Sequence, residues 1–483
     1  MKSIFTFLIA FLLFSVTVSA QWTNYQSAEL VIGQPDFTTY FSNVTATGLW
    51  SPYAVAIDAE HSKMYVADAG NCRVLRYAYP VTANQPIAEV VFGQDNFTSN
   101  KEREYYNTHG GEWREPDAKQ IIQPMALAVY NGDLWVLDEN NNRIVRFSHA
   151  YSISTNNPDA DLVIGQQTFI TRDYSCTSST FYTPWGMTID PTGNLWVADT
   201  GNSRILKFSN VSSLTNGASA TGVLGKDNFV DGGVRPYVTE SSFGIYVSSL
   251  FVDASGTLWV CDRGNNRVLR FDNLPENPMG ESANGVLGQA NFTSKVIATT
   301  QSNFNTPFGV CVDGKGNLYV ADQYNNRIMI FLDAKNKPNG AGADNWLGAS
   351  FWNSNYTYGD KSFAPQGINN LTIDNARGKL FVGDGFANRI MQFAASGTLT
   401  GIQNTLINDN SIYCCPNPAH DFVKITAADR IERVTALDLS GKTIGTMQFD
   451  SENNLNVSHL PNGVYFLRVE TTQGIKNVKL IKK

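Results

Sequence analysis

An Asp followed five residues later by an Arg recurs six times in this chain, within copies of a phrase such as V-A-D-T-G-N-S-R-I-L-K-F at 197–208. The spacing places the two charges on the two sides of a strand-to-strand turn, where a charge-assisted bidentate pair could form. One pocket needs only one set of catalytic residues, so six copies favour a structural brace. The pairs are Asp68 and Arg73, Asp138 and Arg143, Asp199 and Arg204, Asp262 and Arg267, Asp322 and Arg327, and Asp384 and Arg389.

Side chains that differ among the copies are better candidates for binding. An apolar strand precedes each copy, and two of these strands open with Pro-aromatic-Gly, as at 184–186. If the strand starts surround one channel, its mouth offers aromatic faces and a few hydrogen-bonding groups, which suit a neutral sugar-like or peptide ligand. The alternative, that these side chains only fill the channel, stays open. The mouth residues predicted in this way are Tyr53, Met125, Trp185, Ser248, Phe308 and Asn369.

Metal-binding and acid–base groups are sparse at these positions. None of the five His residues falls on an innermost strand, and the strand starts carry neither Asp nor Glu. On the longest loop, at 97–123, His109, Glu112 and Asp117 could form a metal or acid–base cluster, but a solvated loop is the simpler interpretation. The sequence therefore predicts no catalytic residue, no metal and no cofactor, and calcium is left open without a residue that supports it.

The elements that position these residues are β-strands. Two strands joined by a Gly- or Asn-bearing turn precede each Arg, a third strand follows it, and a fourth ends in Gly, as at 223–225. Four antiparallel strands recurring every 60 to 70 residues are typical of a propeller blade. A further fourth strand, at 31–33, precedes the first copy. We therefore predict an all-β, six-bladed propeller over residues 21–396 in which this N-terminal strand completes the last blade and removes the exposed edges.

The recurring phrase, placed after a G-x-L-[WY]-V strand, resembles the NHL repeat over roughly residues 30–395. The last copy departs from the pattern, with Ala387 in the usual Asn place and Asn388 beside it. Six-bladed propellers related to NHL repeats include metal-dependent lactonases and an amidating lyase, and that resemblance implies carboxylate or His ligands at the channel mouth. Because the predicted mouth residues include none, the sequence favours a binding or scaffold module for a glycan, peptide or protein. The alternative is a lactonase- or lyase-type enzyme with a metal at the mouth or on the long loops.

The C-terminal part of the chain follows another pattern. Residues 397–412 are rich in Gly, Thr, Asn and Ser, which is typical of a linker. Residues 413–483 contain P-N-P-A, D-L-S-G-K, L-P-N-G-V-Y-F-L-R-V and a K-L-I-K-K end, and they predict a small β-sandwich-like module. This module closely resembles the C-terminal (Por) sorting domain of the type IX secretion system of Bacteroidota. The resemblance implies the type IX machinery as a partner and a secreted or cell-surface location.

Residues 1–20 have the features of a secretory signal peptide, with Lys2, an apolar run at 4–16 and small residues at 18–20. No other stretch is apolar enough to cross a bilayer, so we expect no transmembrane segment in the exported chain. The net charge of −7, without a basic cluster, argues against a nucleic-acid partner.

The six Cys residues are scattered along the chain. Cys261 and Cys311 lie within apolar strands and are expected to be buried core residues. Cys72 and Cys176 could share one face, so a bridge between them is left open, and no pairing is assigned.

Overall fold

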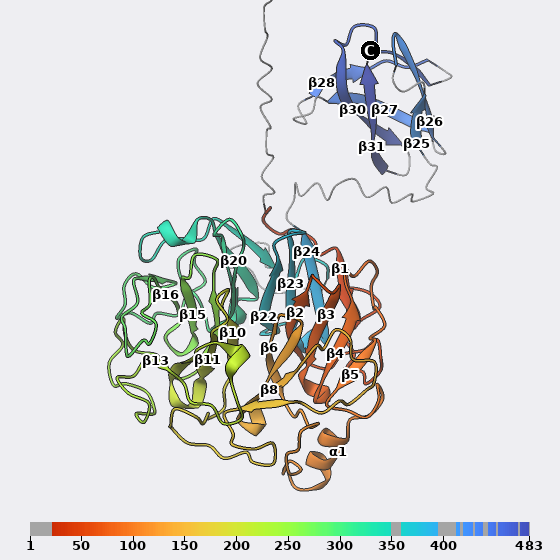
Figure 1. Ribbon diagram of the computed structural model, residues 1–483. Coiled ribbons are helices and arrows are strands. Elements are labelled where there is room, and N and C mark those ends of the chain that lie inside the picture. Colours follow the sequence, from red (N-terminus) through yellow and green to blue (C-terminus); the bar gives the residue numbers. More distant parts are fainter. Residues whose placement is uncertain are drawn as a thin grey trace, which may run out of the picture. The chain divides into compact units, whose positions relative to one another are not determined.

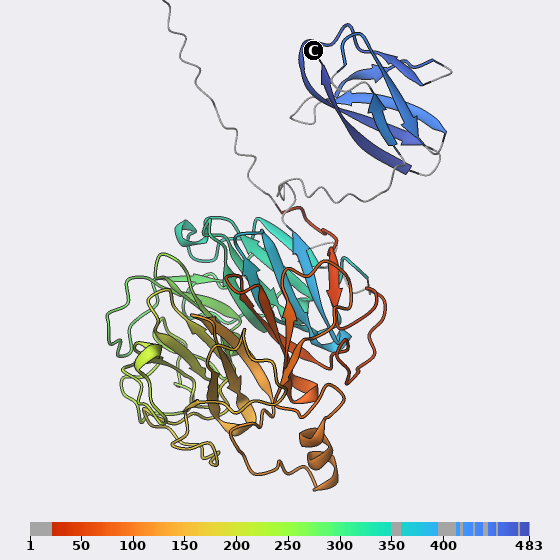
Figure 2. The ribbon, with the colours of Figure 1, turned by 45° about the vertical axis from the view of Figure 1, so that its right-hand side comes forward.

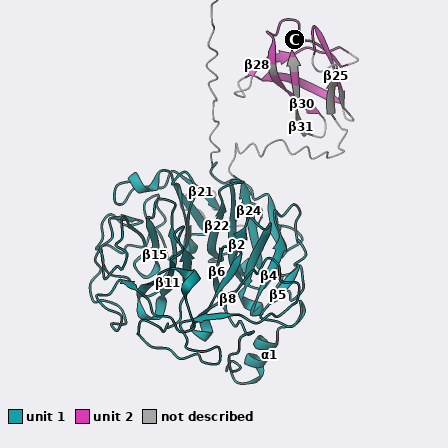
Figure 3. Ribbon diagram, in the orientation of Figure 1, with its two compact units in different colours: residues 1–398 teal, residues 399–483 magenta. Residues whose placement is uncertain are grey.

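The computed structural model describes residues 22–348, 359–394, 412–415, 419–427, 430–437, 443–450, 453–471 and 474–482. The expected signal peptide and all but the last residue of the expected linker lie outside the described residues. The chain divides into two compact units, residues 1–398 and 399–483, which Figure 3 shows in different colours.

Unit 1 consists of six four-stranded antiparallel sheets that follow one another around a common axis (Figures 1 and 2). From the innermost strand outward, the first three blades are β2 (Pro52–Asp58), β3 (Lys63–Asp68), β4 (Arg73–Ala78) and β5 (Val90–Phe92); β6 (Pro124–Tyr130), β7 (Asp133–Asp138), β8 (Arg143–Phe147) and β9 (Leu162–Ile164); and β10 (Gly186–Ile189), β11 (Leu195–Asp199), β12 (Arg204–Phe208) and β13 (Gly222–Leu224). The next two are β14 (Val247–Val252), β15 (Leu258–Asp262), β16 (Arg267–Phe271) and β17 (Gly285–Leu287); and β18 (Pro307–Val312), β19 (Leu318–Asp322), β20 (Arg327–Phe331) and β21 (Asn345–Gly348).

The sixth blade closes the ring with the N-terminal strand. It contains β22 (Ile368–Asp374), β23 (Lys379–Asp384) and β24 (Arg389–Ala394), and its outer strand is β1 (Leu30–Ile32), which pairs antiparallel with β24. In Figure 1 the red β1 lies beside the blue β24. The predicted six-bladed propeller and its closure are therefore confirmed.

Aromatic side chains of the second strands fill the space between blades. The six that occupy equivalent places are buried, with exposed fractions of 0 to 4%: Tyr65, Trp135, Trp196, Trp259, Tyr319 and Phe381. Each packs with aliphatic residues of a neighbouring blade, so the core lies between the sheets. This packing makes the propeller a rigid support for the residues at its two ends.

Each Asp and Arg of the repeated phrase flanks a short 3-10 turn between the second and third strands. In all six copies the Arg Nε donates to the Asp Oδ2 over 2.7 to 3.1 Å, with both side chains buried. The turns are η1 (Ala69–Asn71), η2 (Glu139–Asn141), η3 (Thr200–Asn202), η5 (Arg263–Asn265), η6 (Gln323–Asn325) and η8 (Gly385–Ala387). Two further 3-10 turns are η4 (Val211–Ser213) and η7 (Ala334–Asn336).

The expectation of a bidentate pair is wrong, because the other guanidinium nitrogens bind loop carbonyls. Arg73 Nη1 donates to the Phe97 carbonyl at 2.6 Å, and its Nη2 donates to the Thr45 carbonyl at 2.9 Å. The second oxygen of Asp68 accepts the Trp50 N–H at 2.6 Å. Each charged pair thus ties one turn to the loops before and after its blade, which satisfies buried backbone groups that would otherwise lack partners.

Because neighbouring strands run antiparallel, these turns lie at the same end of the propeller as the long loops that connect the blades. The loop between β5 and β6 carries the one α-helix among the described residues, α1 (Lys101–Thr108), which projects from the propeller near the bottom of Figure 1. The hairpins between first and second strands lie at the opposite end. We call the end with the turns and long loops the mouth face.

Unit 2 consists of two antiparallel sheets. One contains β25 (Ile412–Cys415), β26 (Phe422–Ala427) and β29 (Asn454–Asn456), and the other contains β28 (Thr443–Met447), β27 (Ile431–Leu437), β30 (Gly463–Thr471) and β31 (Gly474–Lys482). Val423 from the first sheet and Val434 and Leu467 from the second are fully buried in one shared core. This arrangement agrees with the predicted sandwich-like module.

Cys261 and Cys311 are buried, as expected, and Cys72 and Cys176 are free, so no bridge joins the latter two. The side chains of Cys414 and Cys415 lie outside the described residues. Within the part of the chain that the structure describes, no helix is long and apolar enough to span a membrane.

Candidate ligand-binding site

The innermost strands are distorted where they reach the mouth face. Their pairing with the second strands shifts register in blades one, two, four, five and six, next to the first residue of the innermost strand. A β-bulge of this kind takes residues out of the ladder and re-aims their side chains. The displaced positions include five of the six predicted mouth residues, Tyr53, Met125, Ser248, Phe308 and Asn369.

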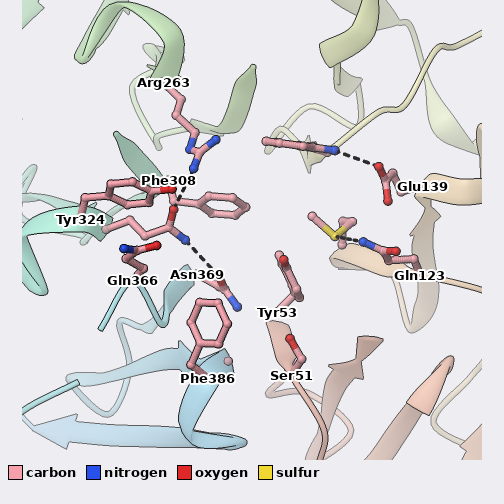
Figure 4. Close-up of a pocket in the computed structure, with 14 residues that line it drawn as sticks. Ser51, Tyr53, Gln123, Glu139, Arg263, Phe308, Tyr324, Gln366, Asn369 and Phe386 are labelled. Carbon is pink, nitrogen blue, oxygen red and sulfur yellow. Dashed lines mark hydrogen bonds between the residues drawn. The ribbon is translucent and has the colours of Figure 1, made fainter. Parts of the chain in front are cut away.

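A cavity of about 230 Å³ opens at the mouth face (Figure 4). Five of the predicted mouth residues line it: Tyr53, Met125, Trp185, Phe308 and Asn369. The ring of Phe308 lies 5.9 Å from that of Tyr53 and 6.0 Å from that of Trp185, between centroids, so the three form a continuous aromatic wall. The structure therefore brings together residues that are more than 250 positions apart in the sequence.

Ser248 does not line this cavity. Its side chain is 1% exposed, and its hydroxyl lies 2.8 Å from the Phe308 carbonyl oxygen and 3.1 Å from that of Pro307. The hydroxyl therefore joins two neighbouring innermost strands. In this blade the bulge turns the Ser248 hydroxyl toward the backbone of the neighbouring innermost strand, and the side chain is too short to extend into the cavity.

The 3-10 turns supply a second ring of lining residues, which the sequence pattern alone did not predict. The position directly after each repeated Asp faces the mouth, and it differs in all six copies: Ala69, Glu139, Thr200, Arg263, Gln323 and Gly385. Of these, Glu139, Arg263, Gln323 and Gly385 line the cavity. Tyr324 and Phe386, one residue farther along, extend its wall where three other copies have Gly. The signal was present in the sequence as variation beside two invariant residues.

Arg263 is the one cationic side chain among the residues that line the cavity. Its Nη2 donates to Gln323 Oε1 at 3.1 Å, and its guanidinium carbon lies 5.8 Å from the ring centroids of Trp185, Tyr246, Phe308 and Tyr324. Rings at this distance attract a cation through their quadrupoles. Gln323 is held in turn, since its Nε2 donates to the Ile368 carbonyl at 3.0 Å. The guanidinium is therefore fixed before any ligand binds.

Glu139 is the one carboxylate of the cavity, and Figure 4 shows it on the other side from Arg263. Trp185 Nε1 donates to Glu139 Oε1 at 3.1 Å. Burial raises the pKa of Glu139 to about 7, with a smaller contribution of the same sign from the charge of Asp138, while the Trp185 hydrogen bond acts in the opposite direction. Burial also raises the pKa of Tyr53, so its hydroxyl stays protonated. Near neutral pH the cavity thus holds a fixed cation and a carboxyl that changes its charge.

The opposite end of the channel differs in chemistry. A cavity of about 210 Å³ there is lined mainly by apolar side chains, among them Val55, Leu127, Ile189 and Ile373, and by no charged residue. Of these two cavities at the ends of the channel, the one at the mouth face is the one that combines charged side chains with several aromatic rings. This contrast makes the mouth cavity the better candidate for a specific ligand.

The long loop between β5 and β6 does not assemble its acidic and His residues into a site. The His109 ring stacks on Tyr105 with a centroid distance of 3.8 Å, and Asp117 receives the N–H groups of Lys119 and Gln120. Glu112 is exposed. Among the described residues, no group of three or more His, Cys, Asp or Glu side chains is arranged to hold a metal.

Comparisons with known proteins agree with this architecture. Residues 411–483 match the family profile of the secretion system C-terminal sorting domain, and residues 181–208 and 304–331 match the NHL repeat. A comparison with curated protein sequences finds no match. The chain therefore contains NHL repeats within its propeller and a C-terminal sorting domain. That domain indicates type IX secretion to the cell surface or the extracellular space, and it implies the type IX machinery as a partner.

Several solved structures are similar to this chain. They include a streptogramin B lyase (15% identity, 74% of this chain and 95% of that chain covered, TM-score 0.38), a protein of unknown function from Bacteroides thetaiotaomicron (12%, 76% and 75%, 0.42) and a gluconolactonase from Xanthomonas campestris (12%, 76% and 99%, 0.41). At these identities and TM-scores the likenesses do not bear on the activity of this chain.

Proposed function

We propose that this secreted propeller is a binding module and that its ligand, a glycan, peptide or protein, binds at the mouth cavity. One observation carries the proposal. Most of the positions at which the six copies differ at the mouth face converge on a single cavity, whereas the repeated Asp and Arg residues are buried and paired with each other. A concave site with aromatic walls and few, fixed polar groups is the usual form of a small-ligand or oligomer-binding site.

The surroundings of the cavity favour a ligand longer than the cavity itself. Many of the exposed large hydrophobic side chains of the described propeller residues belong to the loops and turns of the mouth face, including Phe41, Tyr174, Tyr237 and Phe386, with exposed fractions of 67 to 78%. Exposed apolar and aromatic side chains gathered on one face are a mark of an interaction surface. A chain-like ligand can place one unit in the cavity and its neighbours along these rings.

The test is a binding panel with a variant of the cavity wall. Isothermal titration of the full chain with neutral and charged oligosaccharides and with short peptides should give at least one ligand, and Trp185→Ala should weaken it. Tyr151→Ala is the matched control, because Tyr151 is also half-buried and stacks on His61 at the opposite end of blade one, with a centroid distance of 3.6 Å. Equal loss in both variants, or no ligand at all, would contradict the proposal.

An enzyme of the lactonase or lyase type is the alternative, and Glu139 is the observation that favours it. A half-buried carboxyl with a pKa of about 7 is suited to general acid or base catalysis near neutral pH. The described residues offer it no metal cluster, so the reaction would have to depend on Glu139 itself. Hydrolysis of a lactone, or eliminative cleavage of a uronide to an unsaturated product, by the full chain and abolished in Glu139→Gln would replace the binding proposal with this one.

We further propose that residues 1–20 are removed as a signal peptide and that the propeller is displayed at the cell surface or released. The support is the pattern of Lys2 and the apolar run that follows it, together with the match of residues 411–483 to the sorting domain. N-terminal sequencing of the exported protein tests the first part.

A further inference from the structure

We infer that the ligand of the mouth cavity is an acidic glycan and that Arg263 binds the carboxylate of one of its uronic acid units. This inference rests on the proposed function and names its ligand class.

Arg263 differs from the repeated Arg residues in its partners. Each of those has a carboxylate within 3.1 Å, whereas Arg263 has no acidic partner among the described residues. Its hydrogen bond goes to the neutral Gln323 side chain, and its buried Nε has no partner. A guanidinium carries five N–H donors, so most of its donor capacity is unused. An anionic group of a ligand would supply acceptors for these unused donors.

The rings around Arg263 hold the cation without neutralising it. Trp185, Phe308 and Tyr324 each lie 5.8 Å from the guanidinium carbon, and a cation between rings keeps its full charge. A planar guanidinium in a partly desolvated place binds a planar carboxylate through two parallel hydrogen bonds. In Figure 4 the guanidinium of Arg263 lies above the Phe308 ring, on the inner side of the lining residues.

The charge of the site favours a carboxylate over a phosphate group. Arg263 supplies one positive charge, Glu139 adds negative charge as it ionises, and the chain as a whole carries −7. A phosphate bears nearly two negative charges at neutral pH, of which this site neutralises one. A monoanionic carboxylate is matched by a single guanidinium.

The remaining surface suits a sugar ring. The Trp185 and Phe308 rings stack at a centroid distance of 6.0 Å, and Tyr53 continues the wall, which offers flat faces to the C–H groups of a pyranose. Ser51 and Gln366 line the cavity, and their side chains form no hydrogen bond with the residues that the structure describes. These groups can bind ring hydroxyls, and the exposed rings of the mouth face can contact adjoining units of the glycan.

Isothermal titration of the full chain at pH 6.5 tests the inference. The probes are trisaccharides of galacturonic, glucuronic and mannuronic acid, the same trisaccharides as methyl esters, the neutral hexose counterparts, and an acidic tripeptide with a free C-terminus. At least one uronate should bind, and its ester should bind at least about tenfold more weakly, since the ester cannot form a charge-assisted pair. The difference in affinity between the acid and its ester therefore measures what the carboxylate charge contributes to binding.

The variants are Arg263→Gln, Arg263→Lys and the control Arg377→Gln, which removes one positive charge at the opposite end of blade six, where Arg377 pairs with Asp374 at 3.1 Å. Arg263→Gln should reduce uronate affinity about tenfold or more and leave that for the ester unchanged, Arg263→Lys should fall between, and Arg377→Gln should match the original chain. Thermal unfolding verifies that each variant folds.

Three outcomes overturn the inference while the binding proposal survives: equal affinity for acid and ester, unchanged uronate affinity in Arg263→Gln, or tighter binding of the neutral sugar or the peptide. If the chain binds none of the probes and none of the wider panel, both the inference and the proposed function fall.

Discussion

Replacing Glu139 with Gln should change how the stability of the propeller depends on pH. Burial raises the pKa of this carboxyl from its ordinary value of 4.5 to about 7 in the folded chain. Between these values the folded state keeps a proton that the unfolded state has released, so stability contributed by the neutral carboxyl is present below about pH 4.5 and is lost as the pH rises to about 7. Gln keeps an acceptor for Trp185 Nε1 but has no charge to bury.

The expected magnitude follows from the pKa difference. A change from 4.5 to about 7, a difference of about 2.5, corresponds to about 3.4 kcal/mol if solvent contributes nothing. Glu139 is only partly buried by its accessible surface, so we expect about 2 kcal/mol after screening. The free energy of unfolding of Glu139→Gln, minus that of the original chain, should therefore rise by about 2 kcal/mol between pH 5 and pH 8.

Urea unfolding of the full chain at pH 5, 6, 7 and 8, followed by tryptophan fluorescence, measures this difference. All nine Trp residues lie in unit 1, so the signal reports the propeller and not the sorting domain. Glu104→Gln is the control, because Glu104 is exposed on α1. A difference between Glu139→Gln and the original chain that stays constant within about 0.5 kcal/mol from pH 5 to 8 would show that the carboxyl is hydrated, and the reasoning from burial would be refuted.

Three further predictions concern the brace, its hydrogen bonds and the export domain. Arg204→Gln should lower the free energy of unfolding by about 3–5 kcal/mol, because it leaves the buried Asp199 without its cationic partner. The control is Arg235→Gln, which removes a pair whose Asp227 partner is 72% exposed and should change the free energy of unfolding by less than about 1 kcal/mol. Equal effects of the two variants in urea unfolding would contradict a structural role for the repeated pair. Asn265→Ala removes a 2.9 Å hydrogen bond to Asp262 and should destabilise by about 1 kcal/mol, since blade six folds with Ala387 in that place, and a loss above about 3 kcal/mol would show that the Asn does more. Deletion of residues 411–483 should leave the propeller inside the outer membrane of a host with type IX secretion, and its appearance in the medium on cell fractionation would contradict the sorting role.

Much of the fold could be predicted from the sequence because the same four-strand pattern recurs six times. The Asp and Arg spacing, the alternating apolar strands and the extra strand at 31–33 determine the blade, the number of blades and the closure of the ring. The acceptors that the guanidinium nitrogens of each repeated Arg bind could not be predicted, because they are loop carbonyls from outside the repeated phrase. Phe97 and Thr45, which Arg73 binds, belong to loops of different length and composition.

The cavity was predicted only in part, for two physical reasons. A bulge at the first residues of an innermost strand has no simple sequence signature, yet it decides whether Tyr53 lines the cavity or whether Ser248 turns toward the next backbone. The residues directly after each repeated Asp could not be assigned to the cavity from the repeated phrase, because that phrase indicates a structural turn. Arg263 and Glu139 lie in that turn, and a comparison of the six copies position by position would have singled them out.

The mouth cavity has different side chains on its two sides because the loops leave different amounts of space above the 3-10 turns. In blade four the second turn residue is Gly264, where an added Cβ would lie 2.1 Å from the Ile245 carbonyl oxygen, so the loop backbone itself covers the turn and no larger side chain fits. In blades five and six the same position carries Tyr324 and Phe386, whose rings are 43% and 67% exposed, so the loops there leave room above the turn. Tyr324 therefore stands next to Arg263, Phe386 lies farther along the same side of the mouth, and the carboxyl of Glu139 stands on the other side. A ring of identical blades could not create such a polarity, and we expect the cavity to favour a ligand whose two ends differ in charge.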